Sequence, residues 1–173
     1  EGANVSQPLS NGFQCVTCHD AVPEFTRYEV EMVTFPSGAR LSTDSSDANL
    51  CLNCHQGRES TVSVNRVIAG LDPDTPSEDV GFRNVHYFAA AATLFGGQAQ
   101  GAYQYEGQEY VGRFGHVSAY DTCIECHDAH TLELQEEDCT TCHEGIDDPH
   151  EIRMSETDFD GDGDVEEGLS EEV

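Results

Sequence analysis

The sequence predicts a mostly irregular chain with short α-helices and minor β-hairpins, forming one domain at 1–155 followed by an acidic tail at 156–173. Only 37% of the 173 residues are apolar, and the mean hydropathy is −0.50. Protein side chains alone therefore build only a thin core. All 8 cysteines fall into short motifs at irregular spacing, which argues against a regular repeat. We expect something other than aliphatic side chains to fill the interior.

The charge balance excludes several classes of partner. The chain has 34 acidic residues against 7 basic ones, all arginine, for a formal net charge of -27. Nucleic-acid binding through a basic surface is excluded because it needs clustered Lys and Arg. The same charge argues against docking to anionic lipid. No stretch approaches the roughly 20 apolar residues of a membrane span.

Each cysteine pair is separated by two residues and followed at once by histidine. The four motifs are Cys15-Val-Thr-Cys18-His19, Cys51-Leu-Asn-Cys54-His55, Cys123-Ile-Glu-Cys126-His127 and Cys139-Thr-Thr-Cys142-His143. This pattern is typical of c-type heme attachment. Two thiols add across the two vinyl groups of one heme, and the histidine that follows binds the iron. We therefore expect four covalently bound heme c groups in a heme-cored tetraheme cytochrome c domain.

Three other uses of the cysteines compete with heme attachment. Disulfides suit an exported protein, and two of the motifs lie near zinc-ribbon spacing. Redox C-x-x-C motifs occur singly on a βαβ frame, which this sequence lacks. None of these alternatives explains a histidine after every pair.

Four further histidines match the four vacant axial positions in number. They are His86, His116, His130 and His150. We expect them to be distal iron ligands, against the alternative that some are ordinary surface or core histidines.

Chain geometry limits how these ligands pair. Trans imidazoles on one iron place their Cα atoms roughly 12 Å apart, building on metal–nitrogen bonds of about 2 Å. Three residues span at most about 10–11 Å. His130 therefore cannot be trans to His127, so two hemes must lie close together. Because no other histidine precedes His86, the first two hemes take distal ligands from later in the chain or from another molecule.

Iron held between two imidazoles has no open site for a substrate, so electron transfer is expected rather than enzyme catalysis. Two imidazoles favour ferric iron, and low potentials follow. The neighbouring acids could lower them further, or they could be solvated surface charges; these are Asp20, Glu125, Asp128 and Glu144. Iron–histidine ties close long loops, so the heme-free chain is expected to be unfolded.

The motifs predict one helical turn each, at 14–19, 50–55, 122–127 and 139–143. Residues 60–70 fit either a helix or a strand. A longer helix is expected at 85–95, with His86 at its start and Gly96 as its stop. Hairpins are expected at 103–111 and around 28–38, with a loop at 71–81.

The tail resembles an EF-hand calcium loop. Asp158, Asp160 and Asp162 occupy loop positions 1, 3 and 5, and Gly163 occupies position 6. Asp164 follows at position 7. Position 12 holds a leucine, so Glu166 or Glu167 would have to complete the shell. The alternative is a plain acidic tail.

Two segments resemble multiheme cytochromes of metal-reducing bacteria. One is the run Gly112-Arg-Phe-Gly-His-Val-Ser-Ala-Tyr-Asp-Thr-Cys-Ile-Glu-Cys-His-Asp-Ala-His-Thr131; the other is Ile152-Arg-Met154 followed by Asp158-Phe-Asp-Gly-Asp-Gly-Asp164. The chain most resembles the extracellular tetraheme cytochromes that polymerise into nanowire filaments. The resemblance extends from Cys15 to Asp164 and is most specific in the second half.

This resemblance implies a continuous row of bis-histidine hemes, alternating between stacked and T-shaped pairs. It also implies an exported, extracellular or cell-surface protein that contacts its own copies head to tail, with one distal histidine able to cross to a neighbouring protomer. Redox proteins or extracellular acceptors would be its other partners. Two alternatives stay open: a soluble periplasmic tetraheme shuttle, and a multiheme reductase with one open heme site.

Overall fold

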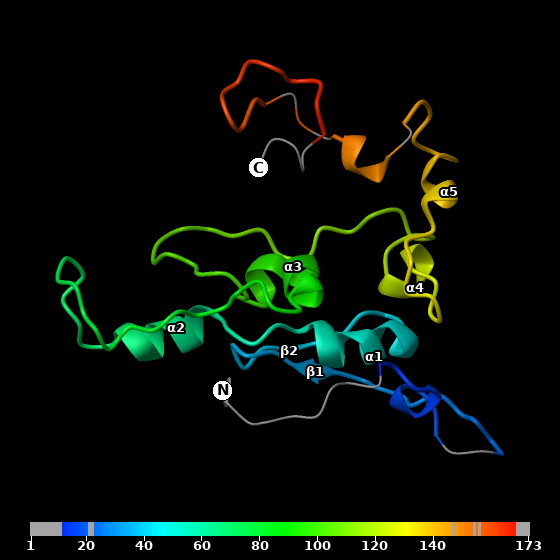
Figure 1. The fold of residues 1–173 in the computed structure, drawn as a ribbon, viewed down its shortest axis with the longest axis horizontal. Helices are drawn as coiled ribbons and strands as arrows, with labels where there is room; N and C mark the ends of the chain where they lie inside the picture. The colour runs from blue at the N-terminus through cyan, green and yellow to red at the C-terminus, as the bar shows by residue number, and fades with distance from the viewer. Residues whose placement is uncertain (1–11, 21–22, 147, 154, 156, 169–173) are drawn as a thin grey trace. The chain divides into compact units, whose positions relative to one another are not determined.

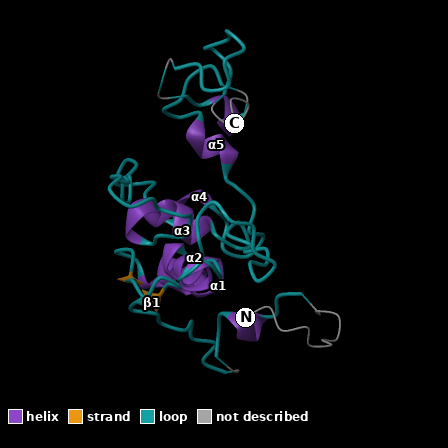
Figure 2. Cartoon of the chain, turned by 90° about the vertical axis from the view of Figure 1, so that its left-hand side faces the viewer, coloured by secondary structure: helices purple, strands orange, loops and turns teal. Residues whose placement is uncertain are grey.

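The computed structural model describes residues 12–20, 23–146, 148–153, 155 and 157–168. Loops and turns dominate this part of the chain (Figure 2), which confirms the expected mostly irregular fold with short helices; of the two expected hairpins, one is present in the described residues. The chain divides into two compact units, Glu1–Thr122 and Cys123–Val173. The predicted division at 155/156 stays a prediction. None of the described helices has the length and apolar character needed to cross a bilayer.

The first unit contains most of the regular structure (Figure 1). Its elements are the 3₁₀ helix η1 (Cys15–Thr17), strands β1 (Val33–Thr34) and β2 (Arg40–Leu41), helices α1 (Ser46–His55), α2 (Thr61–Ile68) and α3 (Ala90–Phe95), and the 3₁₀ helix η2 (Gly96–Gln98).

The two strands form the expected hairpin, but later in the chain than predicted. They pair antiparallel, with Val33 opposite Leu41. The chain reverses between them because Gly38 takes a φ of 91°, a conformation that glycine adopts readily. Pro36 and Ser37 are therefore part of the turn and not of a strand.

Serine side chains start α1 and α2. The hydroxyl of Ser45 accepts a hydrogen bond from the Ala48 N–H, and that of Ser60 accepts one from the Ser63 N–H. Residues 61–68 are therefore helical, and the strand alternative for this segment is wrong. The two helices are separate because Gly57, with a φ of 78°, lies between them.

The apolar core of the described part of the chain lies in the first unit. Among the described residues, the buried apolar side chains are Val33, Phe35, Ala48, Leu52, Ala91, Ala92, Phe95 and Ala99. Half of these are alanines, so the core is small. The rings of Phe35 and Phe95 pack edge to face with centroids 5.6 Å apart. This packing joins the hairpin to α3.

Two predicted elements of the first unit are wrong or too long. The helix expected at 85–95 is only Ala90–Phe95, because Phe88 takes a φ of 49° and residues 85–88 form a turn that contains His86. Gly96 ends the helix as expected. No strand forms in residues 103–111, where a hairpin was predicted. The Val111 carbonyl instead accepts the Gly97 N–H at 2.7 Å. The two backbones approach so closely that a Cβ on Gly97 would lie 2.6 Å from the backbone carbonyl oxygen of Tyr110.

The second unit contains α4 (Cys123–Cys126), α5 (Glu136–Cys139) and the 3₁₀ helix η3 (Pro149–Glu151). The helix predicted at 122–127 is confirmed. At 139–143 the predicted turn forms, with the His143 N–H bonded to the Cys139 carbonyl, but only Cys139 belongs to a helix, because α5 ends there. Among the described residues of this unit, no apolar side chain is buried. The described residues of this unit therefore provide no fully buried apolar side chain around which it could pack.

Candidate functional site

The histidine of each cysteine motif is held on a helical turn. In three motifs its backbone N–H donates to the carbonyl of the first cysteine, four residues earlier, as in an α-helix. These bonds are His19 to Cys15 at 2.9 Å, His127 to Cys123 at 2.8 Å and His143 to Cys139 at 2.9 Å. The remaining motif histidine, His55, is the last residue of α1. The expected single turn per motif is confirmed at this local level.

All eight cysteines are accessible. Cys15, Cys54 and Cys142 are exposed, and the other five are half-buried. A thiol that must bond to an external group needs such access. The four pairs therefore fit covalent attachment better than a role in core packing.

Ring hydrogen bonds fix the tautomer of three histidines. The Nδ1 of His19 lies 3.1 Å from the Phe25 carbonyl, that of His116 lies 3.0 Å from the Tyr120 carbonyl, and that of His127 lies 3.3 Å from the Leu132 carbonyl. A carbonyl oxygen only accepts, so Nδ1 carries the proton and Nε2 keeps its lone pair. This is the arrangement in which metal-binding histidines are held.

After the first and the third motif, the chain returns to the motif and forms similar backbone hydrogen bonds. The carbonyl of Cys18 accepts the Tyr28 N–H at 2.9 Å, and that of Cys126 accepts the Gln135 N–H at 2.8 Å. Isolated antiparallel bridges join His19 to Arg27 and His127 to Leu134. These bonds bring the carbonyls of Phe25 and Leu132 to the two imidazoles.

Three residues beside motif histidines have left-handed backbones. Phe25 and Leu132 have φ values of 49° and 64°, and Phe88 has 49°. The ring of Phe25 stacks on His19 with centroids 4.5 Å apart, and Phe88 meets His55 edge to face at 5.9 Å. Such a backbone costs about 1–3 kcal/mol in a residue other than glycine and clusters at functional sites.

Sequence reasoning missed Phe25, Leu132 and Phe88. Phe25 and Leu132 act through their backbone carbonyls, which every residue type has, so the side chain at these positions carries no signal. The available signal was the Cys-His-Asp shared by the first and third motifs, which are the two motifs that form these returning backbone bonds.

The four remaining histidines share a different backbone support. Each donates its backbone N–H to a side-chain oxygen of Asn or Asp, a local bond that these short side chains form readily. The pairs are His86 with Asn84 at 3.2 Å, His116 with Asp121 at 3.1 Å, His130 with Asp128 at 2.9 Å and His150 with Asp148 at 2.9 Å. All four histidines are exposed. They form one structural class, distinct from the motif histidines.

The histidines divide evenly between the two units. Glu1–Thr122 holds the first two motifs with His86 and His116, and Cys123–Val173 holds the last two motifs with His130 and His150. Each unit therefore contains two motif histidines and two of the second class.

The acids near these histidines are tied to the backbone. Hydrogen bonds from the Thr131 and His130 N–H groups lower the pKa of Asp128. Bonds from the backbone and ring of His150 lower the pKa of Asp148. Asp20 accepts the Thr26 N–H at 2.6 Å. Glu144 is exposed. That these acids lower the reduction potentials of the hemes, and that they are only solvated surface charges, both stay predictions.

The surroundings of Cys126 oppose its thiolate form. Partial burial raises the pKa of this thiol, and the nearby charges of Cys139 and Glu125 raise it further. A thiol–disulfide redox motif needs a lowered cysteine pKa. Cys126 itself therefore lacks the activation that such a role requires.

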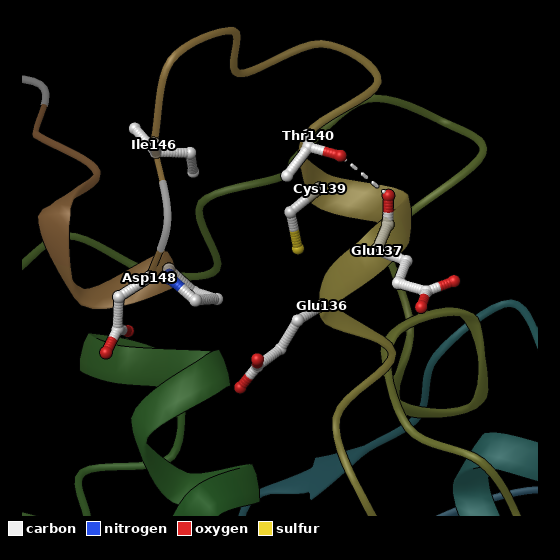
Figure 3. Close-up of a pocket in the computed structure, with 7 residues that line it drawn as sticks. Glu136, Glu137, Cys139, Thr140, Ile146 and Asp148 are labelled. Carbon is white, nitrogen blue, oxygen red and sulfur yellow. Dashed lines mark hydrogen bonds between the residues drawn. The ribbon is translucent and has the colours of Figure 1, made fainter.

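A shallow pocket of about 230 Å³ lies in the second unit (Figure 3). It is lined by Glu136, Glu137, Cys139, Thr140, Ile146, Asp148 and Pro149. Figure 3 shows the Cys139 thiol facing the space between α5 and the turn that carries Asp148. A motif cysteine and the residues preceding His150 thus border one space.

The acidic tail brings three of its predicted ligands together. Ligand oxygens of Asp158, Asp160 and Asp162 lie within 4.8 Å of one another. Asp158 also accepts the Gly163 N–H at 3.0 Å, and Gly163 has a φ of 97°. Asp164 and Glu167 are not part of this described cluster. Three converging carboxylates are a donor set that suits calcium.

Comparisons with known protein families, curated proteins and solved structures found no match for this chain.

Proposed function

We propose that this chain is an electron-transfer protein, not an enzyme, that holds four covalently bound c-type hemes. We further propose that it is the repeating protomer of an extracellular conductive filament. The observation that carries the first proposal is the presence of four C-x-x-C-H turns beside four further histidines that share one backbone support.

The lack of buried apolar side chains among the described residues of the second unit supports this proposal. They bury no apolar side chain, yet they include two helices and two of the four motifs. A domain of this size needs a hydrophobic interior, a metal or another large group to hold it together. Two hemes would supply that interior.

In the proposed protein, the eight motif cysteines hold the hemes, the motif histidines are proximal ligands and the second class of histidines are distal ligands. When bound, the hemes supply the ferric–ferrous couple through which electrons pass. The carbonyls of Phe25, Tyr120 and Leu132 keep the proton on Nδ1 and so direct Nε2 to the metal.

The filament proposal comes from the resemblance of residues 112–131 and of the tail to the nanowire cytochromes. A head-to-tail contact that does not close on itself would extend the chain into a fibre. Because each protomer has a net charge of -27, like charges oppose assembly, and salt or divalent cations should favour it.

A soluble tetraheme shuttle is the second candidate, and one observation favours it. Each unit contains as many second-class histidines as motif histidines. Ligation could therefore be completed within one chain, without a ligand from a neighbouring protomer. A reductase would need one histidine of the second class to stay off the iron.

We also propose that residues 158–167 bind calcium. The convergence of Asp158, Asp160 and Asp162 supports this proposal. Without an acid at position 12, the shell depends on Glu166 or Glu167, so the affinity should be modest.

Three measurements on the exported, matured protein test these proposals. The pyridine hemochrome spectrum should give four hemes per chain; none would refute electron transfer through hemes. Electron microscopy should show filaments, whereas a uniform monomer would favour the shuttle. Electron paramagnetic resonance should show only low-spin iron, and a high-spin signal would favour the reductase.

A further inference from the structure

His150 differs from His19, His116 and His127 in the group that its ring contacts. Its Nδ1 lies 2.7 Å from Oδ1 of Asp148. The Nδ1 atoms of His19, His116 and His127 instead bond to neutral backbone carbonyls. A carboxylate polarises an imidazole N–H more strongly than a carbonyl does.

The chain contains a close match to this turn. Asp128-Ala129-His130 and Asp148-Pro149-His150 have the same spacing, and both histidine N–H groups donate to the aspartate Oδ1 at 2.9 Å. The two turns differ in the next bond. Asp128 Oδ1 also accepts the Thr131 N–H at 2.7 Å. The corresponding N–H of Glu151 donates to the Asp148 carbonyl at 2.9 Å, and Oδ1 of Asp148 bonds to the ring Nδ1 of His150 as well as to its backbone N–H.

We propose that Asp148 is a positioning residue that lowers the reduction potential of the heme ligated by His150. This inference rests on the proposed function. The bond from Nδ1 to the carboxylate raises the electron density on Nε2, and a more basic ligand stabilises ferric iron. Reduction adds one electron to the iron, and the proton stays between Nδ1 and Oδ1. The heme bound by His150 is then a low-potential member of the set.

Asp148 also has a structural role, which the test must separate from the electrostatic one. Its side chain caps η3 by accepting the His150 N–H. Asparagine and serine are good capping residues too. Asp148→Asn and Asp148→Ser therefore keep the cap and remove the negative charge from the ring. Asp128→Asn is the matched control, because it removes the same charge from a turn whose carboxylate bonds to the backbone N–H groups of His130 and Thr131 and to the Thr131 side chain, with no bond to the His130 ring among the described contacts.

The experiment is a potentiometric titration of the heme-loaded protein and the three variants at one pH, followed by visible absorption. In Asp148→Asn and Asp148→Ser, the midpoint potential of one heme should rise by about 59 mV. For a one-electron couple this equals a roughly tenfold higher ferrous-to-ferric ratio at a fixed potential. Asp128→Asn should shift the curve by less than half as much. Superimposable curves for wild type and Asp148→Asn would overturn the proposal, as would an equal shift in Asp128→Asn.

Two controls keep the outcome interpretable. Heme content is measured for the wild type and every variant, because a wild-type chain that carries no heme would refute the proposed function. Four hemes with no shift would refute only the role of Asp148. Electron paramagnetic resonance should show low-spin iron in both Asp148 variants. High-spin iron in both would mean that the carboxylate is needed for ligation itself, which would also overturn a tuning role.

Discussion

The carbonyl oxygen of Phe25 lies 3.1 Å from Nδ1 of His19, and the phenyl ring of the same residue stacks on that imidazole at 4.5 Å. One residue thus fixes both the tautomer and the plane of the ring. Leu132 supplies the same carbonyl contact to His127. Both residues have left-handed backbones, so the chain accepts local strain where two motif histidines must be oriented.

The strain at Leu132 can be tested by substitution. Its side chain is 53% exposed, so little packing is lost when it is removed. Leu132→Gly should be neutral or stabilising by up to about 1 kcal/mol, because glycine adopts a φ of 64° without strain. Leu132→Val should cost about 1–2 kcal/mol, because a β-branched residue resists this conformation. Denaturant unfolding of the heme-loaded protein gives both values; equal stability of the two variants would contradict the account.

The second motif should be the one anchored in the apolar core. Leu52, between Cys51 and Cys54, is fully buried, whereas Val16 holds the same place in the first motif and is exposed. We expect Leu52→Ala to destabilise the protein by about 2–5 kcal/mol. Val16→Ala should change stability by no more than about 0.5 kcal/mol. The comparison uses denaturant midpoints, and a similar cost for both would mean that Leu52 is not a core residue.

The role of the second-class histidines can be separated from that of their backbone support. His86→Ala should leave four hemes on the cysteines but convert one of them to high-spin iron, detected by electron paramagnetic resonance. Asn84→Ala removes only the acceptor of the His86 N–H. It should keep the iron low-spin and cost no more than about 1 kcal/mol of stability. Four unchanged low-spin hemes in His86→Ala would show that His86 is not a ligand.

Calcium binding by the tail should be weak and specific. A dissociation constant of about 10⁻⁴–10⁻³ M is expected, as in extracellular modules. Replacing Asp160 and Asp162 by Asn should abolish binding in isothermal titration calorimetry. The control is the double replacement of Asp72 and Asp74, which removes the same charge from another acidic loop. Equal losses in both variants would indicate nonspecific attraction to the net charge.

The sequence predicted local structure well where a single residue determines it. Gly96 ends a helix as predicted, and each cysteine motif forms about one turn. The Ser60 cap, which makes residues 61–68 helical, was not predicted. It failed where a distant backbone competes for hydrogen bonds. The segment 103–111 alternates like a hairpin, but the Val111 carbonyl bonds to Gly97 and the Tyr105 N–H bonds to the hydroxyl of Tyr110.

The sequence indicates candidate ligands, whose role stays a prediction, but it does not reveal the residues that support them. Cysteine and histidine spacing identifies the groups that can bind a metal cofactor. The left-handed residues Phe25 and Phe88 could not be found, because no local rule places a phenylalanine at positive φ. The contact between Asp148 and the ring of His150 depends on where the neighbouring N–H of Glu151 donates, which the sequence does not reveal.

The central claim is that four porphyrin irons are covalently attached to this chain. Intact mass spectrometry of the denatured, exported protein tests it most directly, because thioether bonds survive denaturation. The account predicts the polypeptide mass of 18.9 kDa plus that of four hemes. A mass equal to the polypeptide alone, or one that rises only by bound zinc, would contradict it.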